Sequence, residues 1–235
     1  MRPASVGPVE VESQDWIPYR VVWEHHSPLV DCCYLGGTRF SEPFFEDTVA
    51  RALRRPCPAA FLRRVSIEAL GQAAGEADPA GLIFHMSRCG STLLSQMLKA
   101  ISGVTVFSEP PPVDAIARAP DLGINVTEDQ QAVWLRSIVR AIGQGGATGQ
   151  GAYVLKLDCA HVMELRLFQR AFPKVPWIFL YRDPIEILAS HASQPAEWTL
   201  PGHLKADRFG FDPNAVAPAA LTEYRTRLLR GMLRE

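Results

Sequence analysis

Two arginines stand directly after apolar, strand-like segments, where their side chains could bind anions. The first, Arg88, follows "GLIFHMS" and precedes Gly90, Ser91 and Thr92 at the start of a leucine-rich helix. Glycine permits a tight turn, the free amides of a helix N-terminus attract an anion, and arginine binds phosphate through two hydrogen bonds. The pattern predicts a phosphate-type anion here, although a simple helix cap at Ser91 or Thr92 would also explain the glycine and the hydroxyls.

The second arginine, Arg182, leaves the apolar run "VPWIFLY", and Ser190 lies eight residues further along the chain. One extended step and two helical turns would bring both side chains to the same crevice, where they suit a second phosphate. The alternative is a surface ion pair of Arg182 with Asp183 or Glu186 and a solvated Ser190. These residues alone leave both interpretations open.

The elements that would position these residues follow from the apolar periodicity. Residues 16–40 read as a hairpin around a turn at 24–28, residues 44–53 as a helix stopped by Pro56 and Pro58, and residues 71–81 as a linker. Strands then alternate with helices, which predicts a three-layer α/β/α fold with a parallel central sheet. In such sheets ligands bind beyond the carboxyl ends of the strands, here at Met86, Phe107, Leu157 and Tyr181.

Three further expectations concern individual elements of this sheet. Apolar residues at helical spacing predict that one face of the first helix after Arg88 is buried, namely Leu93, Leu94, Met97, Leu98 and Ile101. The glycine-rich run 143–151 is expected to be a flexible loop. The strand "VPWIFLY" is apolar enough to be buried on both faces, and Asp183 with Pro184 is expected to open the next helix.

Composition limits the classes of function. The chain has 235 residues, 47% of them apolar, and a net charge of −1, so no global basic field favours nucleic acid. Its five cysteines form no CxxC pair, which favours a reducing cytoplasm over a disulfide framework. No apolar run is long enough for a membrane span, and the N-terminus does not read as a signal peptide.

Together, "SRCGSTLL" and "FLYRDPIEILAS" resemble the two nucleotide-binding motifs of the sulfotransferase family. The resemblance covers residues 81 to about 193 and implies a P-loop-like domain, taken as residues 76–235, after an N-terminal extension, 1–75. It also implies 3′-phosphoadenosine 5′-phosphosulfate (PAPS) as sulfuryl donor, with no metal. The residues implied to bind PAPS are Arg88, Cys89, Gly90, Ser91, Thr92, Leu93, Arg182 and Ser190.

Sulfuryl transfer needs a base that takes a proton from the attacking hydroxyl or amine. Glu109, just after the strand "VTVF", is the first candidate, because the family's base follows the loop arginine by about one helix and one strand. It could instead pair with Arg88 or cap a turn. Asp158 is the second candidate, with a helix cap as its alternative, while Arg88 would stabilise the leaving phosphate.

Two other functions remain open from the sequence. A kinase or nucleotide hydrolase of the P-loop class would need the G-K-[ST] signature, which is absent. A non-catalytic nucleotide-binding module is the other alternative, because the family's basic lid over the nucleotide is missing unless Lys205 and Arg208 supply it. The acceptor cannot be read from the sequence, and a homodimer is a further expectation.

Overall fold

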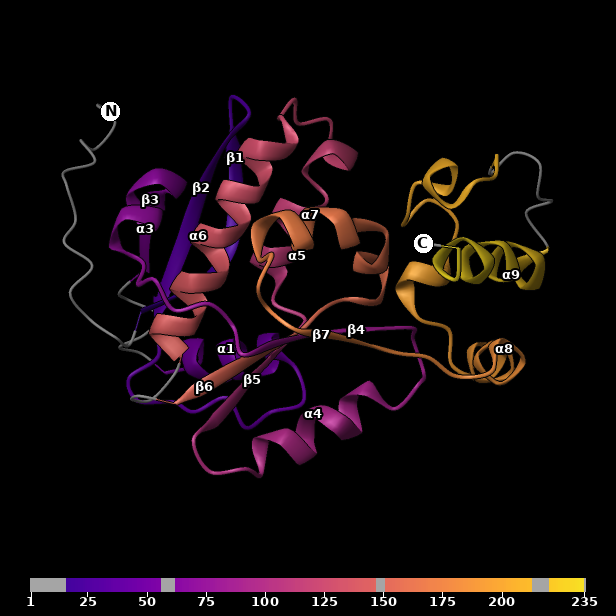
Figure 1. The fold of residues 1–235 in the computed structure, drawn as a ribbon, viewed down its shortest axis with the longest axis horizontal. Coiled ribbons are helices and arrows are strands. Elements are labelled where there is room, and N and C mark those ends of the chain that lie inside the picture. Colours follow the sequence, from indigo (N-terminus) through magenta and orange to yellow (C-terminus); the bar gives the residue numbers. More distant parts are fainter. Residues whose placement is uncertain (1–15, 56–61, 147–150, 213–219, 235) are drawn as a thin grey trace.

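A parallel sheet of four strands lies at the centre of the protein (Figure 1). The computed structural model describes residues 16–55, 62–146, 151–212 and 220–234. The strand order is β5-β6-β4-β7, with bounds β4 (Gly81–His85), β5 (Val104–Ser108), β6 (Ala152–Lys156) and β7 (Trp177–Leu180). One face carries α4 (Ser91–Lys99), and the other carries α5 (Pro111–Ala117), α6 (Glu128–Gly146) and α7 (Leu165–Ala171). The fold is therefore mixed α/β with a parallel sheet flanked by helices, as the alternating pattern predicts.

Helix α6 forms the main core with the upper face of the sheet. The start of the helix is capped, because the Gln130 amide donates to Thr127 Oγ1 at 3.2 Å. Its apolar face is buried throughout and consists of Trp134, Leu135, Ile138, Val139 and Ile142. From the sheet, Phe84 meets Phe168 of α7 edge to face, with ring centroids 5.6 Å apart.

The glycines near residue 145 belong to a helix, so the expected loop at 143–151 is wrong over its first part. Helix α6 continues through Gly146, and residues 147–150 lie outside the described ranges. A Cβ atom at Gly145 would lie 1.9 Å from the Trp16 carbonyl oxygen, and one at Gly143 would lie 2.5 Å from the Tyr153 ring. Here glycine permits close packing of neighbouring elements, not a turn.

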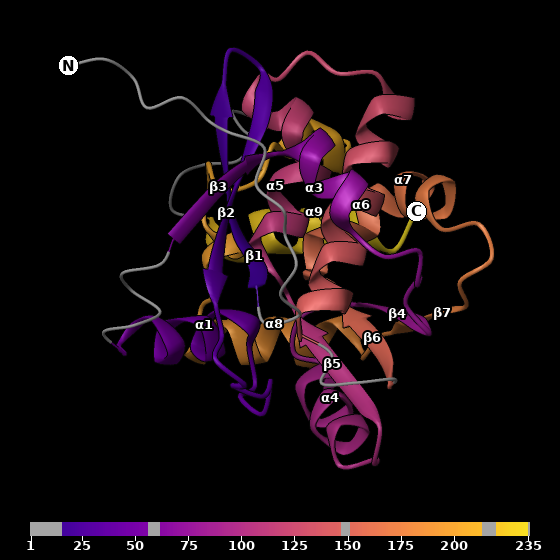
Figure 2. The same ribbon diagram turned by 90° about the vertical axis from the view of Figure 1, so that its left-hand side faces the viewer.

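An antiparallel sheet of three strands stands against α5 and α6 (Figure 2). The predicted hairpin forms β1 (Trp16–Glu24) and β2 (Ser27–Tyr34), and its turn places His25 and His26 at φ 48° and 65°. Two elements were not expected: β3 (Leu62–Ser66), which pairs with β2, and α3 (Ile67–Ala73), which occupies the start of the expected linker. Both sheets contribute side chains to one continuous apolar core.

Helix α1 (Phe45–Leu53) follows the hairpin and buries Phe45, Thr48, Val49 and Ala52 as its periodicity predicts. Phe44, the N-cap residue of this helix, is instead 40% exposed. The prolines expected to stop this helix, Pro56 and Pro58, lie outside the described ranges.

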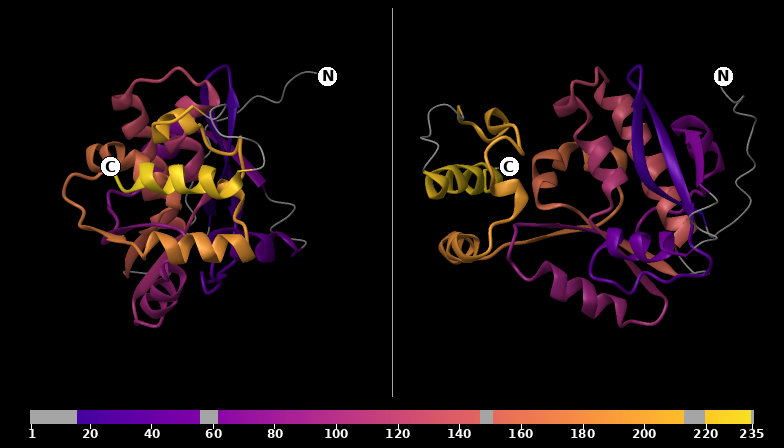
Figure 3. Two further views of the ribbon diagram at one scale, coloured as in Figure 1. Left: turned by 90° about the vertical axis from the view of Figure 1, so that its right-hand side faces the viewer. Right: turned by 180° about the vertical axis from the view of Figure 1, so that it is seen from behind.

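The C-terminal helices form a second, smaller apolar core beside the carboxyl ends of the central strands (Figure 3). Helix α8 (Pro184–Ser193) begins as predicted, because the Asp183 carboxylate accepts from the Ile185 amide at 2.8 Å. It packs against α9 (Leu221–Met232). The short 3₁₀ helices are η1 (Ala119–Leu122), η2 (Cys159–Glu164), η3 (Glu197–Thr199) and η4 (Ala206–Phe209).

Two burial predictions are wrong, and both concern the face of the sheet on which α4 lies. Strand β7 is an edge strand, not a buried one, and Trp177 and Ile178 are 44% and 50% exposed. On α4, Leu93 and Met97 are exposed, whereas Ser91 and Ser95 of the same helix are buried. The sequence pattern does not show how many helices cover each face of the sheet. On this face the described chain places α4, and the region beside β7 is left uncovered.

Four cysteines within the described ranges are free: Cys32, Cys33, Cys89 and Cys159. Burial raises the pKa of Cys32 and of Cys33 to about 12, so these two thiols stay protonated. In the described part of the chain, no helix combines the length and the apolar character that crossing a membrane requires.

Substitution of Gly145 tests the close packing of α6 on β1. In a helix, alanine is favoured over glycine by about 1 kcal/mol, but here the new methyl group would collide with the rigid Trp16 backbone. We expect Gly145→Ala to lower the free energy of unfolding by about 2 kcal/mol or more, measured by urea denaturation. The matched control is Gly75→Ala, whose Cβ would meet only Gln144 Oε1 at 3.8 Å and should change stability little. Equal stability of the two variants would contradict this account.

Candidate functional site

The turn between β4 and α4 leaves the N-terminus of the helix open to a ligand. Gly90 is the N-cap residue, with φ 89°, and no side chain caps the helix. The simple cap at Ser91 or Thr92 that the sequence left open is therefore absent. The Ser91 amide faces the Cys89 sulfur, while the other first amides of α4 have no intrahelical partner and can bind an anion, which the helix dipole favours here.

Two side chains that the sequence singled out sit on strained backbone. Arg88 has φ 60° and Glu109 has φ 53°, both in the left-handed region that favours glycine. Such conformations cost on the order of 1 kcal/mol or more and gather at functional sites. Among the described residues, the only other non-glycine cases are the two histidines of the hairpin turn.

A cavity of about 500 Å³ lies beyond the carboxyl ends of the strands and joins most of the predicted residues. Its predicted lining residues are Arg88, Gly90, Ser91, Thr92, Glu109, Asp158, Arg182 and Ser190. Cys89 and Leu93 do not line it, and the Leu93 side chain is 66% exposed. The cavity has the size and position of a ligand site in a parallel α/β fold.

A buried ion cluster formed by His85, Glu109 and Lys156 makes the floor of this cavity. The ladder between β5 and β6 continues past the strand end, where the Glu109 amide donates to the Lys156 carbonyl at 2.8 Å. The Lys156 ammonium donates to Glu109 Oε1 and is only 1% exposed. Lys156 is therefore buried, and Glu109 pairs with this lysine instead of with Arg88.

His85 completes the cluster from β4. Its Nε2 lies 2.8 Å from the Leu157 carbonyl and 3.4 Å from Glu109 Oε1, and its Nδ1 lies 3.1 Å from the Met86 carbonyl. Both ring nitrogens thus face acceptors, which only the doubly protonated imidazole can satisfy. Burial disfavours this charge, but contacts with Cys89 and Glu109 outweigh it and raise the pKa of His85 to about 9.

The same contacts keep Glu109 ionised. Burial alone would raise its carboxyl pKa, but the hydrogen bond from His85 and the charge of Lys156 lower it below the ordinary value. The pKa of Cys89 is also lowered despite burial, chiefly through its contact with His85.

The remaining predicted residues have other contacts. Arg88 donates to the Gln194 carbonyl at 2.9 Å, and Arg182 forms an exposed ion pair with Glu186. Asp158 is the N-cap of η2, accepting from the Ala160 amide at 2.8 Å. The alternative roles considered for Arg182 and Asp158 thus both occur, while each side chain also faces the cavity.

The sequence reasoning missed several lining residues, among them His85, Phe44 and Trp198. His85 carried a signal, since it is a histidine inside the apolar strand "GLIFHM". Phe44 and Trp198 add aromatic surface from elements distant in sequence, and nothing local marks them. The possible lid residue Arg208 lies elsewhere, between Asp121 and Glu164.

The charges around the cavity favour an anion. Arg88, Lys156, Arg182 and protonated His85 are opposed by the carboxylates of Glu109 and Asp158. This excess of positive charge is local, since the net charge of the whole chain is −1.

Comparisons with protein-family models, with curated proteins and with solved structures find no match to this chain.

The charge state of His85 is testable by NMR titration of the imidazole signals. We expect the wild-type pKa near 9, and Glu109→Gln should move it towards its ordinary value of about 6.5 because the stabilising carboxylate is lost. The matched control is Asp114→Asn, which should lower the pKa of His161, a buried histidine 3.0 Å from Asp114 Oδ1. A His85 pKa near 6.5 in the wild type, or one indifferent to Glu109→Gln, would contradict the cluster.

The same shift predicts how stability depends on pH. The pKa of His85 is higher in the folded chain than in the unfolded chain, so its contribution is fully present below about pH 6.5. It should be lost as pH rises through about 9, the folded value. Urea denaturation across this interval should show a larger decline in the wild type than in Glu109→Gln.

Proposed function

We propose that the protein is a sulfotransferase that moves a sulfuryl group from PAPS to a hydroxyl or amine acceptor. The observation that supports this proposal is that the residues of both predicted anion sites line one cavity. The ionised carboxylate of Glu109 lines the same cavity. The P-loop-like identity of the fold and the two motif resemblances are parts of the same proposal.

Each end of the donor has a binding group in this proposal. The 5′-phosphosulfate lies against the uncapped α4 N-terminus, where the amides, Ser91, Thr92 and Arg88 neutralise it. The 3′-phosphate takes Arg182 and Ser190. Arg182 must then leave Glu186, and this exchange is cheap because the pair is exposed.

The transfer itself is an in-line displacement at sulfur. The acceptor oxygen or nitrogen forms a bond to sulfur while the bond from sulfur to the 5′-phosphate oxygen breaks, and that phosphate leaves with the electron pair. Glu109 accepts the acceptor's proton, with Asp158 as the alternative base. Lys156 and His85 hold Glu109 ionised and oriented, although the same pairing weakens it as a base. Arg88 and the α4 amides stabilise charge on the leaving phosphate.

A non-catalytic nucleotide-binding module is the second candidate. Arg208, proposed as a lid residue, is held by Asp121 and Glu164 and does not line the cavity. Such a module would bind the nucleotide without turnover, so activity separates the two candidates. A kinase would differ from both candidates in binding ATP-magnesium more tightly than 3′,5′-adenosine bisphosphate.

Binding of nucleotides should follow the two anion sites. We expect 3′,5′-adenosine bisphosphate to bind more tightly than ATP-magnesium in calorimetric titrations. Arg182→Ala should weaken the bisphosphate by about tenfold and leave 5′-AMP, which has no 3′-phosphate, nearly unchanged. The control is Arg230→Ala, an exposed arginine of α9. Equal weakening of both nucleotides would remove the role of Arg182, and tight binding of ATP-magnesium alone would overturn the proposal.

Turnover should depend on Glu109. In a sulfate-transfer screen with radiolabelled PAPS and mixed hydroxyl and amine acceptors, Glu109→Gln should lower kcat by about 100-fold or more. Bisphosphate binding, measured in parallel, should persist. Transfer undiminished in Glu109→Gln but lost in Asp158→Asn would reassign the base. Bisphosphate binding without any transfer by the wild type would favour the module.

A further inference from the structure

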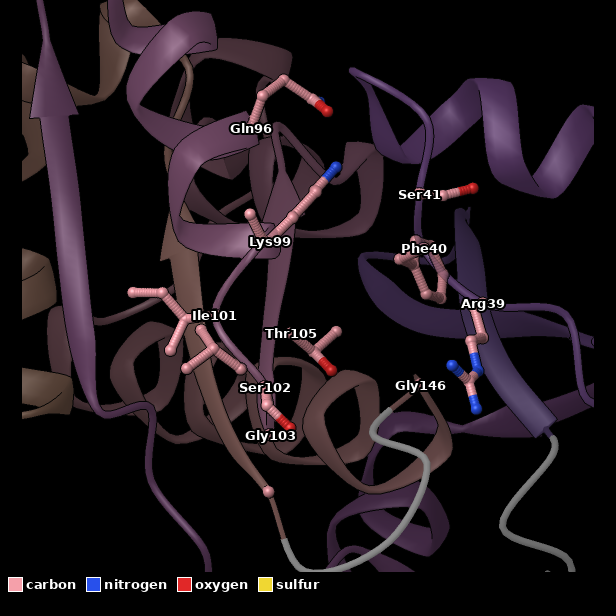
Figure 4. A pocket seen from close by; sticks show the side chains of 13 residues that line it. Arg39, Phe40, Ser41, Gln96, Lys99, Ile101, Ser102, Gly103, Thr105 and Gly146 are labelled. Carbon is pink, nitrogen blue, oxygen red and sulfur yellow. The ribbon is translucent and has the colours of Figure 1, made fainter.

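A second cavity, of about 790 Å³, opens at the other end of the sheet. It lies between the last turn of α4 and segment 39–41, and Thr105 near the start of β5 lines it as well (Figure 4). Glu109 follows the opposite end of β5, so about 13 Å of strand separates the two sites. A ligand in the second cavity would therefore leave the first one free.

The charged groups of the second cavity are both cationic. Lys99 extends from α4 into the space, and Arg39 lies on the facing wall (Figure 4). Within the described part of the chain, no aspartate or glutamate lines this cavity. Two cations on opposite walls, with no carboxylate among the described lining residues, create a local field that attracts an anion.

Arg39 lacks the carboxylate partner that several other arginines of the described chain have. Arg20 and Arg64 share Asp31, Arg51 pairs with Glu42, and Arg140 pairs with Asp78. The Arg39 guanidinium, by contrast, forms no hydrogen bond or ion pair with any residue in the described ranges. Its backbone carbonyl accepts from Arg51 and from the Ser41 amide. Its five donors are available to a ligand.

The Lys99 ammonium also has hydrogen-bond donors available to a ligand. Its half-buried ammonium donates to the Glu42 carbonyl. Burial and the nearby charge of Lys156 lower its pKa, and this outweighs the opposing effect of Glu42 and Asp47. A bound anion would relieve this unfavourable environment.

The rest of the lining is polar in the middle and rigid at the side. The hydroxyls of Ser102 and Thr105 line the cavity on the side across from Arg39 and hydrogen-bond to no other described residue (Figure 4). The Phe40 ring is fixed by Phe45 and Phe107, with centroid distances of 5.0 and 4.9 Å. A wall already fixed in place loses little entropy when a ligand binds.

We propose that this cavity binds a small organic acid with two anionic groups, one held by Arg39 and the other by Lys99. Ser102 and Thr105 donate hydrogen bonds to carboxylate oxygens of the ligand. The volume suits a molecule larger than a single inorganic anion. The C-terminal dipole of α4 opposes an anion here, which explains why two cations are needed. The site does not depend on the proposed sulfotransferase activity.

The test is a calorimetric titration of the full chain with glutarate, a flexible dicarboxylate. We expect saturable binding by the wild type within about 20 mM, and none of 1,5-pentanediol, which has the same carbon chain without charge. Arg39→Gln and Lys99→Gln should each weaken glutarate by about tenfold, while Lys99→Arg, which keeps the charge, should bind it. The affinity of the wild type should fall as pH rises and Lys99 loses its proton.

The matched control is Arg54→Gln, which removes an exposed arginine outside the cavity. It should change glutarate affinity less than twofold, a shift on the order of 0.4 kcal/mol. Arg39 is exposed, so Arg39→Gln should remain folded, and circular dichroism checks this for every variant. Absence of saturable glutarate binding, or equal weakening by Arg54→Gln and Arg39→Gln, would overturn the proposal.

Discussion

The buried ion cluster of His85, Glu109 and Lys156 is the interaction on which the site depends. It joins the ends of three neighbouring strands, since these residues end or follow β4, β5 and β6. A buried lysine without a partner would be strongly destabilising, so Glu109 must stay ionised and in place. The cluster thus fixes the floor of the cavity, while the uncapped α4 N-terminus and two arginines supply its positive wall.

The 39–45 segment connects the two cavities of the protein. Arg39, Phe40 and Ser41 line the second cavity, whereas Phe44 lines the first and stacks near the Lys156 ammonium, 5.2 Å from its ring centre. Lys99 holds this segment through the Glu42 carbonyl. The same segment, residues 39–45, therefore contributes to the stability of the first cavity and to the shape of the second.

Much of the fold could be predicted because the local patterns agree with it. Strand ends at the Arg88 and Arg182 turns, the Thr127 cap and the Asp183 cap all follow from local chemistry. The failures come from tertiary packing. Gly143 and Gly145 lie in a helix, where the absence of a side chain lets neighbouring elements approach closely. Strand β7 is exposed because it is an edge strand. The residues at the strand ends were predicted, but the pairing of Glu109 with Lys156 and His85 depends on strand order, which the sequence does not specify.

The central claim is that one nucleotide spans both anion sites of the first cavity. A crystal structure of the protein with 3′,5′-adenosine bisphosphate tests it most directly. The account predicts the 5′-phosphate on the amides of Gly90 to Thr92, the 3′-phosphate on Arg182 and Ser190, and an open space between the 5′-phosphate and Glu109. A nucleotide bound with its ends reversed, or bound outside this cavity, would contradict it.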